Sequence, residues 1–155
     1  MMTLRCKPLL LLPLMLLCNA CAADEAILPN PGFEQLDTDG RPEGWQVDEG
    51  LQVLSGDDAY AGERAVRVRY RSGLRQDLQT QPGEMYLLRG YTRRPPGEAP
   101  LSGRVLVRWL DDTGSKVSGN TDFRHTAGST WTQFSHLIAI PEGCTRIQLV
   151  VDGPY

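Results

Sequence analysis

From Ala26 onward, the sequence runs in short alternating segments that Gly, Pro and Asp interrupt every few residues. Polar and apolar residues alternate with a period of two in these segments, and no stretch sustains the period of an amphipathic helix. Short alternating runs separated by turn residues are typical of an all-β sandwich. We therefore predict seven to nine strands in one domain that covers residues 26–155.

The alternation also predicts which side chains are buried. In segment 85–93, Tyr86 and Leu88 alternate with Arg89 and Tyr91, so Arg89 and Tyr91 are expected on a solvent-facing side. In segment 30–45, Phe33 and Trp45 are separated by tight turns, and we expect both to pack into the core. Further core positions come from segments 104–110, 131–140 and 146–151: Val105, Val107, Trp109, Phe134, His136, Ile138, Ile140, Ile147, Leu149 and Val151.

Residues 1–20 have the character of an export signal peptide. A basic start precedes the apolar run 9–17, which is too short for a membrane span and contains a proline. Two processing sites fit the next residues. Lipidation of Cys21 predicts a lipoprotein of the cell envelope, with residues 21–25 as a tether and the domain on the periplasmic side or the surface of the outer membrane. Cleavage after Ala22 instead predicts a soluble periplasmic or secreted protein.

Charge and cysteine content exclude other classes of protein. The chain carries 16 Lys and Arg against 19 Asp and Glu, a net charge of −3, which argues against nucleic-acid binding. Of the four cysteines, only Cys144 lies outside the first 21 residues, so no disulfide framework is expected in the domain. We expect Cys144 to be a small buried side chain.

Six segments in order resemble the CenC-type carbohydrate-binding modules of families 4, 9 and 22. They are NPGFE (30–34), PEGW (42–45), DDAYAGERAVRV (57–68), QPGEMYLLRGY (81–91), VRWLDDTG (107–114) and WTQFSHLIAIPEGCTRIQLVV (131–151). The resemblance implies a galactose-binding-like jelly-roll sandwich that binds polysaccharides such as β-glucans or xylans. Family members usually end with one more strand beside the first, and its apparent absence here predicts an unpaired sheet edge.

A sugar site needs flat aromatic faces and planar polar groups on a solvent-exposed surface. Tyr91 is the leading candidate for stacking, although it could equally be an ordinary half-exposed tyrosine, and Trp131 could lie on either face of its strand. The polar contacts are expected from Arg89, Arg108 and Gln148, and further ligand contacts from Phe123 and His125. The many arginines could hold an acidic polysaccharide or could pair with the acids of the chain.

Calcium and catalysis complete the set of predictions. The resemblance implies a structural calcium ion, for which Glu34, Asp57 and Asp58 are the candidate ligands. No catalytic motif is present, and two histidines give no zinc constellation, so we predict a module that is not an enzyme. The competing hypothesis is a structural or protein-interaction lipoprotein that pairs with an envelope protein by strand addition.

Overall fold

The computed structural model describes residues 5–6, 28–70, 72–100 and 102–153. The described part is all-β, apart from a single turn of 3-10 helix, as predicted. Its elements are β1 (Arg5–Cys6), β2 (Gln46–Val47), β3 (Gln52–Ser55), η1 (Gly56–Asp58), β4 (Arg64–Arg67), β5 (Leu74–Gln79), β6 (Met85–Thr92), β7 (Ser102–Leu110), β8 (Thr121–Thr126), β9 (Thr132–Ala139) and β10 (Arg146–Asp152). Nine of the ten described strands, β2 to β10, lie within residues 26–155, in agreement with the predicted seven to nine, and β1 lies within the predicted signal peptide.

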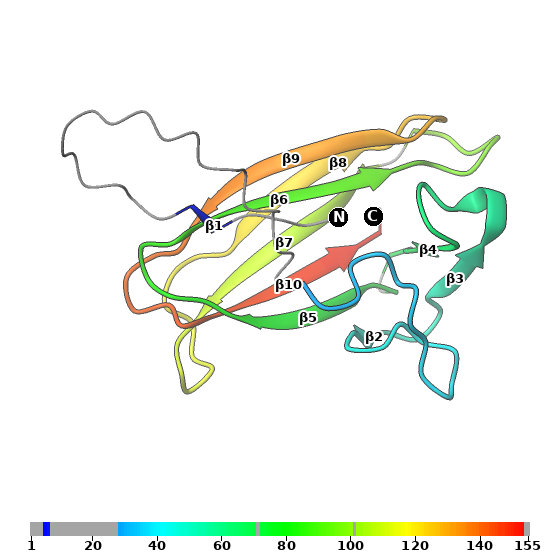
Figure 1. The fold of residues 1–155 in the computed structure, drawn as a ribbon. Coiled ribbons are helices and arrows are strands. Elements are labelled where there is room, and N and C mark those ends of the chain that lie inside the picture. Colours follow the sequence, from blue (N-terminus) through cyan, green and yellow to red (C-terminus); the bar gives the residue numbers. More distant parts are fainter. Residues whose placement is uncertain (1–4, 7–27, 71, 101, 154–155) are drawn as a thin grey trace, which may run out of the picture.

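The strands form two packed layers and a separate hairpin (Figure 1). The larger layer has five antiparallel strands in the order β2-β5-β10-β7-β8, so the last strand of the chain lies in its centre. The second layer has the order β1-β6-β9 and covers one face of the first. Strands β3 and β4 pair only with each other among the described residues, and their hairpin (residues 52–67) lies at one end of the sandwich.

The core lies between the two layers and consists of the residues that the alternation predicted. Tyr86, Leu88 and Ile138 face it from the three-stranded layer, while Val107 and Ile147 face it from the five-stranded layer. Trp109 and Cys144 are also buried, as expected. Because side chains alternate along a strand, burying these positions forces their neighbours on the same strands to the two outer surfaces.

The segment 30–45 closes one side of the core, as predicted. The rings of Phe33 and Trp45 pack with their centroids 5.4 Å apart. Trp45 is 8% exposed, and its indole Nε1 donates a hydrogen bond to the carbonyl of Asn30 at 3.2 Å. The Asn30 side chain also donates to the carbonyls of Gln35 and Glu43, at 2.8 and 3.0 Å, which ties the turns of this segment together.

Two of the predictions differ from the structure or lie outside it. The turn residues 111–114 predict a hairpin that continues into residues 116–117, but the structure has only a single bridge at Lys116 there, and the strand that pairs with β7 is β8. The signal peptide, the tether and Cys21 lie outside the described residues, apart from Arg5 and Cys6 in β1. In the part of the chain that the structure describes, no helix has the length and apolar character needed to cross a membrane.

Candidate functional site

Three rings gather on the outer surface of the three-stranded layer. Tyr91 comes from β6, Trp131 directly precedes β9, and Tyr60 comes from the loop between η1 and β4. The Tyr60 and Tyr91 rings stack at a centroid distance of 3.6 Å, and Tyr60 meets the Trp131 ring edge-on at 5.8 Å. Tyr60 is 49% exposed. We call Tyr60, Tyr91 and Trp131 the aromatic patch.

A cation and a carboxylate hold the aromatic patch together. The Arg93 guanidinium lies 5.1 Å from the centroid of the Trp131 ring, in the geometry of a cation–π contact. The same guanidinium donates a hydrogen bond to Asp58 Oδ1 at 2.6 Å, which ties the η1 turn to the end of β6. A hydrogen bond with the Tyr91 side chain raises the pKa of the Tyr60 phenol, so that Tyr60 is uncharged at neutral pH.

The alternation of β6 explains why Tyr91 faces outward. Its neighbour Gly90 faces inward, where the ring of Phe134 covers it, so Tyr91 must point to the opposite side. Arg89 has the same parity as Tyr91 and lies opposite Ser135 of β9, so it shares this outer surface. The structure therefore brings together three predicted ligand residues: Tyr91, Trp131 and Arg89.

Tyr60 is the member of the aromatic patch that the sequence did not predict. It lies in the polar loop 55–63, whose ends are joined by a hydrogen bond from the Gly56 N–H to the Glu63 carbonyl at 3.0 Å. Gly56 adopts a φ of +70°, which allows the tight turn that begins this loop. The available signal was an aromatic residue within a loop that is otherwise small and polar.

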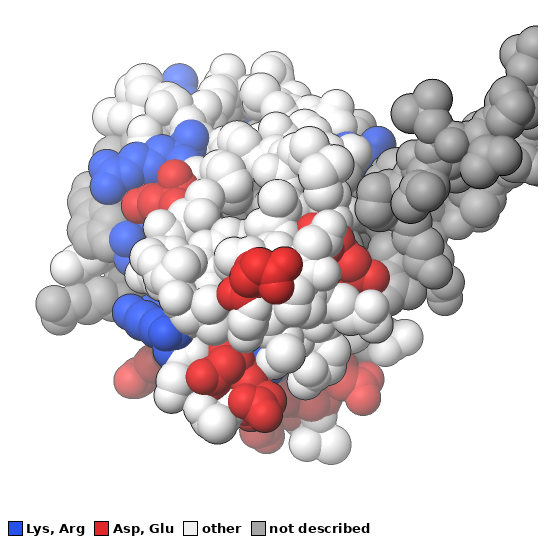
Figure 2. Space-filling model, turned by 90° about the vertical axis from the view of Figure 1, so that its left-hand side faces the viewer, with Lys and Arg blue, Asp and Glu red and all other residues white. Residues whose placement is uncertain are grey.

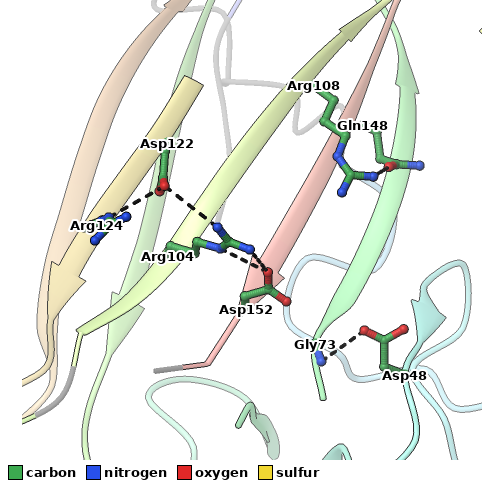
Figure 3. Close-up of polar contacts among 8 residues, drawn as sticks. All are labelled: Asp48, Gly73, Arg104, Arg108, Asp122, Arg124, Gln148 and Asp152. Atoms are coloured by element: carbon green, nitrogen blue, oxygen red, sulfur yellow. Dashed lines mark hydrogen bonds and ion pairs between the residues drawn. The ribbon is translucent and has the colours of Figure 1, made fainter. Parts of the chain in front are cut away.

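Arg108 and Gln148 lie elsewhere, on the outer surface of the five-stranded layer (Figure 3). Arg108 Nη1 donates to Gln148 Oε1 at 2.7 Å, and Gln148 Nε2 donates to Asp77 Oδ1 at 2.9 Å. Because the core separates the two outer surfaces, these residues do not form one site with Tyr91. The five strands of this layer place no aromatic side chain on this surface among the described residues.

The other arginines of the five-stranded layer are paired with acids. Arg104 donates to Asp152 Oδ2 at 2.7 and 3.0 Å and lies 3.9 Å from Asp122 (Figure 3). Arg124 lies 3.6 Å from the same Asp122 carboxylate. Further pairs join Arg67 to Glu98, Arg75 to Asp48 and Arg146 to Asp77. These contacts show arginines paired with acids of the chain itself, which is one of the two alternatives that the sequence left open.

Phe123 and His125 point between the layers rather than along an outer groove. Phe123 stacks on His136 at 4.0 Å and His125 stacks on Phe134 at 4.2 Å, with both ring pairs within 23° of parallel. Burial lowers the pKa of His125, and the positive charge of a protonated His136 is the second cause. These side chains therefore belong to the interior at the β8–β9 edge and do not reach the aromatic patch through a shared surface.

Two of the three proposed calcium ligands, Glu34 and Asp58, are engaged in other contacts. The Glu34 carboxylate accepts hydrogen bonds from the backbone N–H groups of Glu63 and Arg64, at 3.1 and 3.4 Å. Asp58 is paired with Arg93. No three His, Cys, Asp or Glu side chains come together as a metal site among the described residues. Calcium requires six to eight oxygen ligands, so Glu34, Asp57 and Asp58 do not fit it.

Comparison of the sequence with protein-family models and with curated proteins finds no match. Comparison of the structure finds similar folds in carbohydrate-binding modules. The C-terminal family 22 module of Clostridium thermocellum Xyn10B has a TM-score of 0.54 and 21% identity, over 82% of this chain and 87% of that one. The TmCBM61 module, solved with β-1,4-galactotriose, has a TM-score of 0.53 and 21% identity, over 83% and 88% of the two chains. The chain has the fold of these modules.

A similar fold also occurs within a larger protein. The enzymatically active domain of Bacteriophage CBA120 tailspike protein 4 has a TM-score of 0.55 and 16% identity, but this chain spans only 17% of its length. The resemblance to carbohydrate-binding modules is therefore confirmed for the β-sandwich fold. At these levels of identity the likeness extends to the fold alone, so the ligand must be argued from the surface of this chain.

Proposed function

We propose that this chain is a non-catalytic carbohydrate-binding module whose aromatic patch stacks against a sugar. The observation that carries the proposal is the half-exposed Tyr60 ring, held parallel to Tyr91 and beside Trp131 on a sheet surface. The apolar face of a pyranose packs well on a rigid aromatic ring, which loses little conformational freedom on binding. The fold shared with carbohydrate-binding modules supports the same role.

The charge distribution favours a neutral glycan over an acidic one. The arginine nearest the aromatic patch, Arg93, is neutralised by Asp58, and Arg104 and Arg124 of the five-stranded layer are paired with acids. Figure 2 shows the other end of the sandwich, away from the aromatic patch, and there too acidic side chains lie beside basic ones and neither sign covers the surface. An acidic polysaccharide would meet carboxylates wherever it met these guanidinium groups, which weakens its attraction.

Binding of neutral oligosaccharides, measured on a glycan array and then by calorimetry, tests this function. We expect Tyr60→Ala and Tyr91→Ala each to weaken binding about tenfold or more, equivalent to ~1.4 kcal/mol. Tyr70→Ala is the matched control, because Tyr70 is 50% exposed and is not a member of the aromatic patch. Equal affinity in all three variants, or no binding to any glycan by the wild type, would contradict the proposal.

We further propose that the module is exported and anchored to the cell envelope through lipidated Cys21. The apolar run 9–17 and the cysteine that follows it support this proposal. Incorporation of labelled palmitate should disappear in Cys21→Ser while folding of the domain is unchanged. Retention of the label in that variant would contradict lipidation at Cys21, and an unlabelled, soluble periplasmic wild type would favour cleavage without lipidation.

Protein interaction is a second candidate, and exposed apolar side chains favour it. On the same outer surface, at the other end of β6 and β9, Leu137 is 62% exposed and Met85 is 38% exposed. Such side chains are common at interfaces when they lie together. Leu137→Asp separates the two functions, because it should abolish capture of a protein partner and leave glycan binding unchanged.

A further inference from the structure

Both histidines of the chain are partly buried and lie in one cluster at the β8–β9 edge. The sequence contains only two histidines, and the ring centroids of His125 and His136 are 5.0 Å apart. Each imidazole stacks on a phenylalanine of the opposite strand: His125 on Phe134, and His136 on Phe123. The four rings therefore form an alternating aromatic and imidazole layer that joins β8 of one sheet to β9 of the other.

The surroundings of this cluster are apolar. Across the ladders, His125 lies opposite Gly103 of β7 and His136 lies opposite Leu88 of β6. The Nε2 atoms of both histidines are buried and have no hydrogen-bond partner among the described residues. A neutral imidazole tolerates this position through stacking, but a protonated one places an unpaired N–H and a positive charge there.

The charged side chains of the packed strands do not face the cluster. By alternation they point to the outer surfaces of both layers: Arg89 on β6, Arg104 and Arg108 on β7, and Asp122 and Arg124 on β8. Strand β9 carries no charged residue besides His136. Beyond β6, Arg94 directs a guanidinium N–H to the carbonyl of Glu98. No carboxylate on these four strands is therefore placed to neutralise a protonated histidine pair.

We propose that the His125–His136 cluster is an acid-sensitive joint, in which proton uptake by the two imidazoles loosens the packing of β8 against β9. The first proton adds a buried charge, and the second adds a like charge only one ring away. Both charges weaken the contact between β8 and β9, because each histidine stacks on a phenylalanine of the strand that carries the other histidine. The joint closes the edge between the two layers, where no backbone pairing joins β8 to β9 in the described residues.

The direction of the pH dependence follows from the burial of His125. Burial lowers its pKa in the folded protein, so the unfolded chain takes up this proton more readily. The stabilisation is fully present above the ordinary histidine pKa of about 6.5 and is lost as the pH falls below that value. Trp131 precedes β9 directly, so loosening of β9 should also reach the aromatic patch. This last step rests on the proposed glycan function.

The decisive experiment compares the wild type with His125→Phe/His136→Phe, which keeps four stacked rings and removes both titrating groups. Hydrogen exchange, corrected for the intrinsic effect of pH, is measured at about pH 7.5 and about pH 5, on either side of the histidine pKa. In the wild type, we expect protection of β8 and β9 to fall several-fold at the lower pH, while β5 and β10 change little. In the double variant, protection should stay constant, and an equal loss in both proteins would overturn the proposal.

A second measurement decides the matter if the double variant does not fold. The Hε1 resonances of the two wild-type histidines can be followed by NMR during an acid titration. A His125 midpoint below the ordinary value, accompanied by changes in the Phe123 and Phe134 signals, supports the joint. An unshifted His125 midpoint with unchanged phenylalanine signals overturns it. Failure to bind any glycan at either pH would refute only the proposed function, because neither exchange nor NMR depends on a ligand.

Discussion

The ring of Phe134 covers Gly90 on the inward face of β6, so a substitution at Gly90 tests which face of this strand is buried. A methyl group added at Gly90 would lie 2.7 Å from Phe134 Cε1 and closer still to Cζ. Non-bonded carbon atoms prefer about 3.5–4.0 Å, so the ring or the strand must shift by roughly 1 Å. Overpacking costs about 1–3 kcal/mol, and restriction of the unfolded chain by Gly→Ala offsets only about 0.4–1 kcal/mol of this. We expect Gly90→Ala to lower the free energy of unfolding by about 1–2 kcal/mol.

Urea unfolding measures this change, which should move the midpoint down by about 0.5–1 M. Gly119→Ala is the matched control, because no atom lies within 4 Å of the added methyl group and Gly119 has no left-handed φ. In a Phe134→Leu background, the cost of Gly90→Ala should shrink. If Gly90→Ala is as stable as Gly119→Ala, then Phe134 does not cover this glycine, and the outward position of Tyr91 is refuted with it.

Three further predictions follow from individual contacts. A double-mutant cycle between Tyr60→Leu and Tyr91→Leu should give a coupling energy of about 0.5–1.5 kcal/mol in thermal unfolding, and additive effects would contradict the stack. Hydrogen bonds from the Thr113 hydroxyl and the backbone N–H groups of the turn lower the pKa of Asp111 in the folded protein. The contribution of Asp111 to stability is therefore present above its ordinary pKa of 3.8 and is lost as the pH falls through its pKa in the folded protein. Melting of Asp111→Asn should therefore depend less on pH below about pH 4 than melting of the wild type, and equal slopes would contradict this. Chelation with EDTA should leave the melting temperature unchanged, because the Glu34 carboxylate is already engaged by backbone N–H groups, whereas a fall of several degrees would reveal a calcium site.

The side of the sheet on which each side chain lies was predictable, because assigning one residue of a strand to the core fixes the sides of all the others. Once Tyr86 and Leu88 are assigned to the core, Arg89 and Tyr91 must face outward, and the structure has them there. The same logic placed Trp109 inside with its apolar neighbours. A period of two, however, does not say to which sheet a strand belongs. Arg108 was correctly expected on an outer surface, but its surface is on the other layer from Tyr91.

The composition of the site was less predictable than the fold. Tyr60 reaches Tyr91 through a contact between residues 31 positions apart, and no local pattern encodes how a loop docks on a remote strand. Phe123 and His125 alternate with charged residues, and a histidine in such a strand suggests a ligand contact. The partial burial of His125 follows from the ring of Phe134 that faces it, and only the packing of the two layers brings these rings together.

The aromatic patch joins two parts of the sandwich that share no backbone pairing among the described residues. The β3–β4 hairpin reaches the β6–β9 ladder through the Tyr60 stack and the Asp58–Arg93 pair. A ring stack contributes about 0.5–1.5 kcal/mol and a partly exposed ion pair about 0–1 kcal/mol, so each of these two contacts is a modest tie between Tyr60 and β6. A glycan that touches both Tyr60 and Trp131, as proposed, contacts both parts and must therefore also stabilise their contact. On that proposal we expect Asp58→Ala to weaken glycan binding without removing a contact to the sugar, because Asp58 helps to hold Tyr60 in place.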